Sequence, residues 1–468
     1  MAATTETDIF TVNPSDGSPL ERISVFGSAQ VDGVLDRARD FFGTWRAVSF
    51  ERRRTFLLAY AKALREQSES LASTAVREMG KPIAQARAEI EKCAACCDFF
   101  AVHGARFIAD RVVETDATLS YVAFRPLGVI LAVMPWNFPY WQVVRAFAPA
   151  VAAGNVVVLK HASNTTRCGL ELERLTQECG AGGALQTLIL PNDRIAEIVS
   201  DPRIAAVTLT GSEGAGISVA KAAGAVLKKC VLELGGSDPF IVLADADIDK
   251  AVETAVKARF QNAGQSCIAA KRFIIEAPAY DRFVESFARA SAAQRVGDPF
   301  DDLTQVGPCA RGDLRDALQK QIDASRARGA RIVTGGRHVE RPGFYFEPTV
   351  VADVTPGMPM FDEETFGPAA AVVKARDESH AVELANDTPF GLGSNIWSRD
   401  IPRARRIAER IEAGSAFVNG MVASDPRLPF GGIKRSGYGR ELSEYGIHEF
   451  TNVQTVWIGP ARDGHDAR

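Results

Sequence analysis

The sequence has few histidines, no long apolar run and no excess of charge of either sign. It contains 6 histidines, and 54 Lys plus Arg face 58 Asp plus Glu, for a formal net charge of -4. Because positive and negative charges are almost equal in number, the sequence gives no sign of the clustered basic surface that nucleic-acid binding needs. No stretch reaches the roughly 18 apolar residues that span a bilayer. We therefore expect neither nucleic acid nor a membrane as a partner, and no metal site built from several histidines.

The cysteines also argue against two classes of protein. Only 8 are scattered over 468 residues, which is too sparse for a disulfide framework. The N-terminus lacks the basic and apolar regions of a secretory signal, so we expect reduced thiols in the cytoplasm. Cys93, Cys96 and Cys97 form a cluster, but they lie in a helix-forming stretch without the second ligand pair of a zinc site. We interpret them as buried helical thiols.

Hydrophobic periodicity divides the chain into a helical part and two alternating parts. Apolar residues at spacings of three and four predict helices over 31–45, 52–67 and 84–107. From 155 to 234 short apolar strands alternate with helices, and a similar pattern runs from 239 to about 419. This alternation predicts parallel doubly wound sheets, which bind ligands at the carboxyl ends of their strands.

The segment FQNAGQSC places Cys267 after a Gly-Gln-Ser loop and ahead of a predicted strand. A loop cysteine at such a point is exposed enough to serve as a nucleophile, provided that a base or positive charge favours its thiolate. Taken alone, a cysteine is more often a small buried apolar residue.

Two further motifs carry polar groups at the ends of predicted strands. Glu233 in LELGG ends a buried strand, where burial would raise its pKa toward the range of a general base. The alternative is a structural ion pair. Asn137 in PWNFP precedes a helix and could donate to a developing oxyanion. The alternative is an ordinary helix N-cap.

Together, the ordered motifs PWNFP, VVLK, LTGS, LELGG, GQSC, EETFGP and LPFGG resemble those of the aldehyde dehydrogenase superfamily, over about 13–457. The resemblance implies that Cys267 attacks an aldehyde carbon and that Asn137 and the Cys267 backbone N–H hold the oxyanion. Hydride transfer to a nicotinamide would leave a thioester, which water activated by Glu233 would hydrolyse. The presence of Glu233 favours a free acid as product over transfer to coenzyme A.

The resemblance also implies an α/β fold with two doubly wound parallel-sheet domains and a small β arm. We expect residues 1–107 and 127–234 to form a cofactor-binding domain and residues 235–448 to form a catalytic domain. Residues 108–126 and 449–468 would form the oligomerisation arm and the C-terminal tail, because a terminal strand needs a partner edge. A homodimer or homotetramer is expected.

Several residues match the family's cofactor site. Lys160 matches a lysine that binds the adenosine ribose, and the helix after Gly211 and Ser212 would face the pyrophosphate. The remaining matches lie around the nicotinamide end, at Trp136, Asn137, Leu234, Glu364 and Phe366. NAD-preferring relatives often carry a glutamate three residues after the lysine, where this chain has the neutral Ser163. Because Ser163 carries no negative charge, it does not repel a 2′-phosphate. We therefore predict NADP+ as the cofactor, with use of NAD+ as the alternative.

The helix after PWNFP indicates the class of aldehyde. Asn137, Trp141 and Arg145 fall on roughly one helical face, so Arg145 could grip a substrate carboxylate. The alternative is a surface or interdomain arginine. The wider segments look most like succinate-semialdehyde dehydrogenases, in which the residues matching Arg145 and Ser424 hold the carboxylate. We predict Arg427 as a second basic candidate, and apolar walls formed by Phe138, Trp141, Phe260 and Phe430.

Two alternative functions remain open from the sequence. One is oxidation of another short carboxylated aldehyde, such as glutarate semialdehyde, because one methylene changes pocket affinity by only about 1–3 kcal/mol. The other is a non-catalytic binding protein on the same fold. Such a protein would be expected to lack Cys267, Glu233 or Asn137, and all three are present. The family's redox partner cysteine is replaced by Ala269, so that disulfide switch is excluded.

Overall fold

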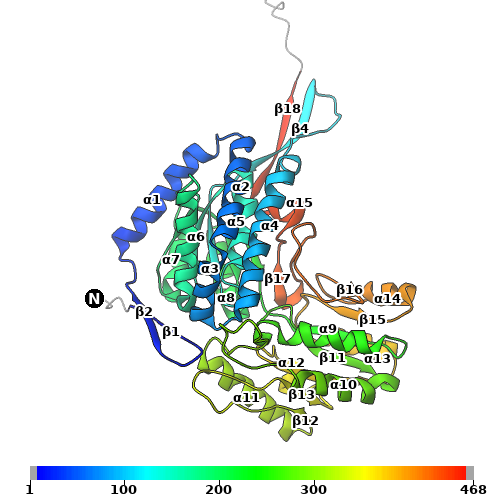
Figure 1. Cartoon of the computed structure of the whole chain (residues 1–468). Coiled ribbons are helices and arrows are strands. Elements are labelled where there is room, and N and C mark those ends of the chain that lie inside the picture. The colour runs from blue at the N-terminus through cyan, green and yellow to red at the C-terminus, as the bar shows by residue number, and fades with distance from the viewer. Residues whose placement is uncertain (1–7, 460–468) are drawn as a thin grey trace, which may run out of the picture.

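The computed structural model describes residues 8–459 as two mostly parallel sheets, a layer of N-terminal helices and a projecting β arm (Figure 1). The predicted α/β class with two doubly wound sheets is confirmed. Residues 1–7 of the predicted cofactor-binding domain, and residues 460–468 of the predicted tail, lie outside the described part of the chain.

The N-terminal part opens with a hairpin and continues as helices. The hairpin strands are β1 (Ile9–Val12) and β2 (Pro19–Ile23), and the helices are α1 (Ser28–Trp45), α2 (Phe50–Glu66), α3 (Ser68–Met79) and α4 (Ile83–Phe107). The three helices predicted from apolar spacing are confirmed as α1, α2 and α4. Gly80 separates α3 from α4, since its left-handed φ of 75° is a conformation that favours glycine. The thiols of Cys93, Cys96 and Cys97 are buried in α4.

The first sheet has six strands in the order β17-β9-β8-β5-β6-β7. Its parallel strands are β5 (Val129–Met134), β6 (Val156–His161), β7 (Leu185–Thr187), β8 (Ile204–Thr210) and β9 (Lys229–Glu233), and β17 (Gly437–Tyr438) joins antiparallel. Connecting helices are α5 (Trp141–Ala153), α6 (Thr166–Glu178), α7 (Ile195–Ser200) and α8 (Glu213–Ala225). β7 ends at Thr187, and beyond it the carbonyl oxygen of Ile189 accepts a hydrogen bond from the backbone N–H of Phe26.

The strand order of the first sheet reverses between β5 and β8. The chain moves outward from β5 to β6 and β7, then returns to β8 and moves the other way to β9. Right-handed crossovers consequently place α5 and α8 on opposite faces. The crevice beyond the carboxyl ends of β5 and β8 is thus the expected ligand position in such a sheet.

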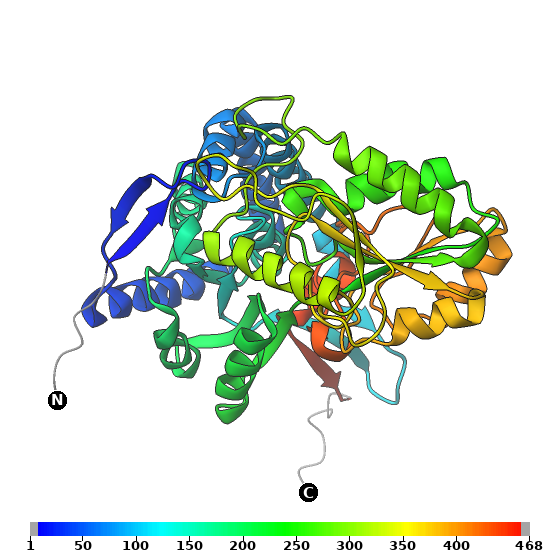
Figure 2. The ribbon, with the colours of Figure 1, turned by 90° about the horizontal axis from the view of Figure 1, so that it is seen from below.

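The second sheet has seven strands in the order β12-β13-β14-β11-β10-β15-β16. They are β10 (Asp238–Val242), β11 (Ala270–Glu276), β12 (Arg331–Thr334), β13 (Thr349–Ala352), β14 (Ala369–Ala375), β15 (Asn395–Trp397) and β16 (Phe417–Val418). Helices cover both faces (Figure 2): α9 (Ile248–Phe260) and α10 (Tyr280–Ala292) pack into one core, and α11 (Gly312–Ala327), α13 (Glu378–Asn386) and α14 (Ile401–Ala408) into another. The short α12 (Pro359–Asp362) lies beside α11.

The arm is a three-stranded antiparallel sheet that projects from the body (Figure 1). Its strands are β3 (Arg111–Val112), β4 (Leu119–Pro126) and β18 (Thr451–Ile458). β18 pairs with β4 along its whole length, from Thr451 opposite Pro126 to Ile458 opposite Leu119. Its outer edge is not paired within residues 8–459, and the large side chains of Val453 and Trp457 are exposed.

Residues 437–449, which precede strand β18 of the arm, pack against the first sheet and its helices. β17 pairs with β9, placing Gly437 opposite Glu233, and α15 (Ser443–Glu449) packs on α4 and α5. We predicted these residues to be part of the catalytic domain, 235–448. In the structure, Leu442 and Ile447 pack into the hydrophobic core around the first sheet. Among residues 8–459, no helix is both long and apolar enough to cross a membrane.

Candidate active site

The loop that carries Cys267 is held in an unusual backbone conformation. Asn262, Ala263 and Gly264 all adopt left-handed φ angles, of 54°, 52° and 71°. Such conformations cost free energy for non-glycine residues and persist only where surrounding contacts fix them. Here the buried Arg259 donates to the carbonyl oxygens of Gly264 at 2.6 Å and Gly367 at 2.7 Å. A rigid loop consequently delivers Cys267 at the amino end of β11.

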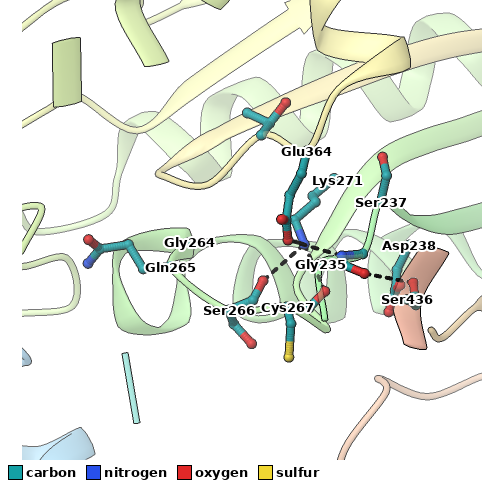
Figure 3. A network of polar contacts seen from close by, with 12 residues as sticks. Gly235, Ser237, Asp238, Gly264, Gln265, Ser266, Cys267, Lys271, Glu364 and Ser436 are labelled. Atoms are coloured by element: carbon teal, nitrogen blue, oxygen red, sulfur yellow. Dashed lines mark hydrogen bonds and ion pairs between the residues drawn. The ribbon is translucent and has the colours of Figure 1, made fainter. Parts of the chain in front are cut away.

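Lys271 fixes the backbone of the nucleophile loop from the other side. Its ammonium donates to the carbonyl oxygens of Ser266 at 3.0 Å and Cys267 at 2.8 Å, and lies 3.2 Å from a carboxylate oxygen of Glu364. Figure 3 shows these contacts, with the sulfur of Cys267 directed away from Glu364. The backbone N–H of Cys267 has no acceptor in the described part of the chain, so it is available to a ligand.

The thiol of Cys267 is protonated at neutral pH. Burial raises its pKa to about 12, opposed by the positive charges of Arg145 and Lys271. The negative charges of Glu233 and Glu364 add to the increase. Generating the nucleophilic thiolate therefore depends on these surrounding charges.

Asn137 is positioned by two helices. The carboxylate of Glu89 on α4 accepts the backbone N–H groups of Tyr140 and Trp141, each at 2.9 Å, which fixes the start of α5. The Asn137 amide nitrogen donates to the carbonyl oxygen of Gln265 at 3.0 Å, and its amide oxygen accepts from Gln142 at 3.1 Å. One of its two N–H hydrogens is thereby used, and the second is available to a developing negative charge.

Glu233, at the carboxyl end of β9, is buried without a hydrogen-bond partner for either carboxylate oxygen within residues 8–459. Burial raises its pKa well above the usual value, and the nearby carboxylate of Glu441 raises it further. Arg145 opposes this shift. Gly431 leaves room for the carboxylate, since a Cβ there would lie 2.6 Å from a Glu233 oxygen. A desolvated carboxylate of this kind is suited to accept a proton.

One pocket of about 360 Å³ lies at the carboxyl edge of the first sheet, at the β5–β8 reversal. It is lined by all the residues predicted to contact the nicotinamide end and the pyrophosphate of a dinucleotide: Trp136, Asn137, Leu234, Glu364 and Phe366 for the first, and Gly211 and Ser212 for the second. Ser212 caps α8 by accepting from Ala215, so this helix directs its positive end toward the pocket. The arrangement fits an anionic dinucleotide with its pyrophosphate at α8.

Lys160 and Ser163, predicted to hold the adenosine end, lie near the carboxyl end of β6: Lys160 is within the strand and Ser163 follows it. The ammonium of Lys160 contacts the amide oxygen of Asn192, and burial lowers its pKa to about 8. Ser163 begins a short 3-10 turn (Ser163–Thr165), and no acidic residue occurs between Lys160 and this turn. These residues fit a phosphate-bearing ribose better than a bare ribose diol.

A second pocket, of about 120 Å³, meets the first at Cys267 and Gln142. It is lined by most of the residues predicted to contact the aldehyde: Phe138, Trp141, Arg145, Ser424 and Phe430. The buried Arg145 is ion-paired with Glu441, donates to Thr210 at 3.3 Å and lies 4.7 Å from the centre of the Phe430 ring. Cys267 thus lines both pockets, the larger one with the residues predicted for the nicotinamide and the smaller one with Arg145 and Ser424.

This geometry agrees with comparisons to known proteins. A model of the Aldehyde dehydrogenase family matches residues 1–456. The chain belongs to this family. It is 47% identical over 458 residues to a succinate semialdehyde dehydrogenase (NAD(P)+), Sad, of Escherichia coli strain K12, covering 98% of this chain and 99% of the relative. It is 48% identical to succinate-semialdehyde dehydrogenase (NADP(+)) 1 of Mycobacterium bovis, over 96% of this chain and 99% of the relative.

Solved structures of family members agree with the fold as well. A succinic semialdehyde dehydrogenase from Streptococcus pyogenes, in complex with NADP+, superposes with a TM-score of 0.94 and 38% identity. The match covers 97% of this chain and 100% of that one. The whole aldehyde dehydrogenase architecture is therefore present here.

Two predicted substrate contacts lie elsewhere in this aldehyde dehydrogenase. Phe260 is buried at the end of α9, where it packs against Phe287 with ring centres 6.3 Å apart, and it does not line the pocket. Arg427 is exposed and donates to Asp425 at 2.9 Å and 2.6 Å. Its charge is satisfied two residues away, outside the pocket.

Four polar residues of the site were missed by the sequence analysis. Gln142 contacts Asn137, Lys271 contacts Cys267, and Glu441 contacts Arg145. The fourth, Lys92, lines the smaller pocket. For Lys92 a signal existed in the helical pattern. It lies three residues after Glu89 on the inward side of α4, where charged residues are costly unless they have a partner or a ligand.

Proposed function

We propose that the protein oxidises succinate semialdehyde to succinate with NADP+. The observation that carries this proposal is the position of Cys267 at the meeting point of two pockets. One of them fits a dinucleotide, and the other ends in cationic and hydroxyl groups suited to a carboxylate. The close relatives that carry this activity in their names support the same conclusion.

Cys267 begins the reaction by forming a covalent bond. The thiol first loses its proton to solvent, the sulfur adds as the thiolate to the aldehyde carbon, and the carbonyl oxygen becomes an oxyanion. The Asn137 amide and the Cys267 backbone N–H donate to this oxygen, which stabilises the charge as it develops. When bound, NADP+ supplies the acceptor for the hydride that leaves the same carbon, so that a thioester remains on Cys267.

Glu233 completes the reaction by hydrolysis. Its carboxylate takes a proton from water, the resulting hydroxide adds to the thioester carbon, and the bond to sulfur breaks. Succinate leaves as a free carboxylate, and the thiolate of Cys267 is regenerated. The raised pKa of Glu233 suits this role, because a stronger base takes the proton more readily.

The preference for NADP+ follows from Lys160 in β6 and Ser163 just after it. Lys160 offers a positive charge to a 2′-phosphate, and Ser163 offers a hydroxyl donor in place of a repelling carboxylate. The helix α8 stabilises the pyrophosphate through its positive end. NAD+ retains most of these contacts and remains a slower alternative.

Arg145 and Ser424 bind the substrate carboxylate in this proposal, and Phe138, Trp141 and Phe430 form the apolar walls around its methylene groups. The ion pair with Glu441 orients Arg145 and leaves part of its planar donor set for the substrate.

We also propose the wider organisation implied by the family. Residues 8–107 and 127–234 would bind the cofactor, and the second sheet would carry the catalytic loop. The arm, with its exposed outer edge on β18, would join subunits of a homodimer or homotetramer. We place the enzyme in the cytoplasm, as the reduced state of its cysteines suggests.

Product analysis tests this proposal. Purified protein mixed with succinate semialdehyde and NADP+ should form succinate and NADPH in equal amounts, without added coenzyme A. The Cys267→Ala variant should bind NADP+ as the parent protein does but form no succinate. Succinate formation by Cys267→Ala, or no turnover by the parent protein, would refute it.

A further inference from the structure

We propose that Lys92, together with Ser424, selects aldehydes that carry a carboxylate, by supplying a positive charge without an ion-pair partner on the wall of the substrate pocket. This inference rests on the proposed function and names a residue that determines its specificity. Lys92 comes from α4, a helix that contributes neither the nucleophile nor the dinucleotide pocket.

The position of Lys92 is defined by contacts with two residues that line the pocket. Its ammonium donates to the Ser424 hydroxyl oxygen at 2.7 Å and lies 4.3 Å from the centre of the Trp141 ring. Both neighbours line the same pocket as Cys267. Lys92 therefore lies among the groups that a substrate bound to Cys267 would approach with its far end.

The charge balance distinguishes Lys92 from Arg145. Arg145 is ion-paired with the buried carboxylate of Glu441, so the two charges largely cancel. Lys92 has no carboxylate within ion-pair distance in the part of the chain that the structure describes. The carboxylates of Glu89 and Asp425, whose charges act on Lys92, are themselves paired with Lys81 and Arg427. A partly buried ammonium without a counter-ion is unfavourable, and a substrate carboxylate would relieve that cost.

The hydroxyl of Ser424 gives an independent indication of the ligand. Its oxygen accepts hydrogen bonds from Lys92 and from the indole N–H of Trp141, at 2.7 Å and 3.1 Å. A hydroxyl oxygen has two acceptor positions, and both are thus occupied. The remaining hydroxyl hydrogen has no acceptor among the described residues, so Ser424 can act toward a ligand only as a donor. Lys92 thereby adds its own charge and orients a second donor for an anion.

The surroundings of Lys92 also allow a bound ligand to change its protonation. Burial and, to a smaller extent, the positive charge of Arg145 lower the pKa of Lys92 to about 8. An anion placed between Lys92 and Ser424 would favour the charged form. A neutral aldehyde of the same length would leave the ammonium uncompensated, so the pocket distinguishes the two substrates by charge.

The test uses Lys92→Met, which keeps the aliphatic chain and removes the charge, and Lys92→Arg, which keeps a charge. The exposed Lys62 on α2 provides a matched control as Lys62→Met. For each full-length protein, kcat/KM is measured with succinate semialdehyde and with butanal at saturating NADP+. Inhibition by succinate is measured with butanal as substrate, as a second readout of carboxylate binding.

Loss of a charge-assisted hydrogen bond predicts that Lys92→Met lowers the ratio of the two kcat/KM values by about 10- to 100-fold. Most of the change should be in KM, and succinate should inhibit correspondingly less. Lys92→Arg should recover much of the ratio, and Lys62→Met should leave it unchanged. If Lys92→Met does not fold, Ser424→Ala should lower the same ratio by about 3- to 10-fold.

An unchanged ratio in Lys92→Met, or equal losses for both aldehydes, would overturn the role of Lys92. Failure of the proposed function looks different, because the parent protein itself would then show no preference for succinate semialdehyde.

Discussion

Arg145 and Glu441 form an ion pair inside the protein, and the unpartnered carboxylate of Glu233 lies close enough for the three charges to influence one another. Two carboxylates and one guanidinium are thus buried together beside the nucleophile. The pair connects α5 of the first sheet to the segment that precedes α15.

Removing Arg145 should therefore destabilise the fold as well as impair catalysis. Arg145→Met leaves Glu441 buried without its partner, and we expect the free energy of unfolding to fall by about 3–5 kcal/mol. The double variant Arg145→Met with Glu441→Gln should recover part of that loss. Urea unfolding followed by circular dichroism measures both effects. Equal stability of the single variant and the parent would contradict a buried, energetically coupled pair.

Changing Glu233 to Gln should separate the two halves of the reaction. Thioester formation needs no proton transfer to Glu233, whereas hydrolysis does, so a burst of NADPH equal to the enzyme concentration should precede a slow steady state. Stopped-flow absorbance reports the burst. Glu409 is exposed beyond the second sheet, so Glu409→Gln serves as a control that should behave like the parent. A steady rate close to that of the parent would exclude Glu233 as the base.

Cofactor preference should change with the residue three positions after Lys160. Ser163→Glu places a carboxylate where a 2′-phosphate would lie, and we expect the ratio of kcat/KM for NADP+ to that for NAD+ to fall at least about tenfold. Ser163→Gln, of similar size and without charge, should lower it less. If the two variants have equal ratios, size and not charge governs the preference.

The rate of Cys267 alkylation should rise with pH. Burial raises the thiol pKa to about 12, so the thiolate fraction is small at neutral pH and grows about tenfold for each pH unit below that value. Iodoacetamide labelling of the protein without cofactor, followed by mass spectrometry between pH 7 and 10, measures this slope, with Cys267→Ala giving the background. A rate independent of pH would mean that Cys267 is already a thiolate.

The sequence predicted those features that depend on short, contiguous patterns. Alternating strands and helices predicted both sheets, and motif matches predicted that Glu233, Asn137 and Cys267 act together. Asn137 follows β5 and Glu233 ends β9, and the carboxyl ends of these parallel strands lie at the same edge of the sheet, with β8 between them.

The residues that were missed or misplaced depend on contacts between distant segments. Lys92 meets Ser424 across 332 residues of sequence, and no local pattern defines that contact. Phe260 borders the nucleophile motif, but its position on α9 directs it into the core with Phe287. The charge of Arg427 is satisfied by Asp425, only two residues away.

Initial rates with four substrate mixtures test the proposed function most directly: succinate semialdehyde and butanal, each with NADP+ and with NAD+. We predict that kcat/KM is at least about tenfold higher for succinate semialdehyde than for butanal, and higher with NADP+ than with NAD+. Equal values for the two aldehydes would contradict a carboxylate-binding pocket and leave a general aldehyde dehydrogenase.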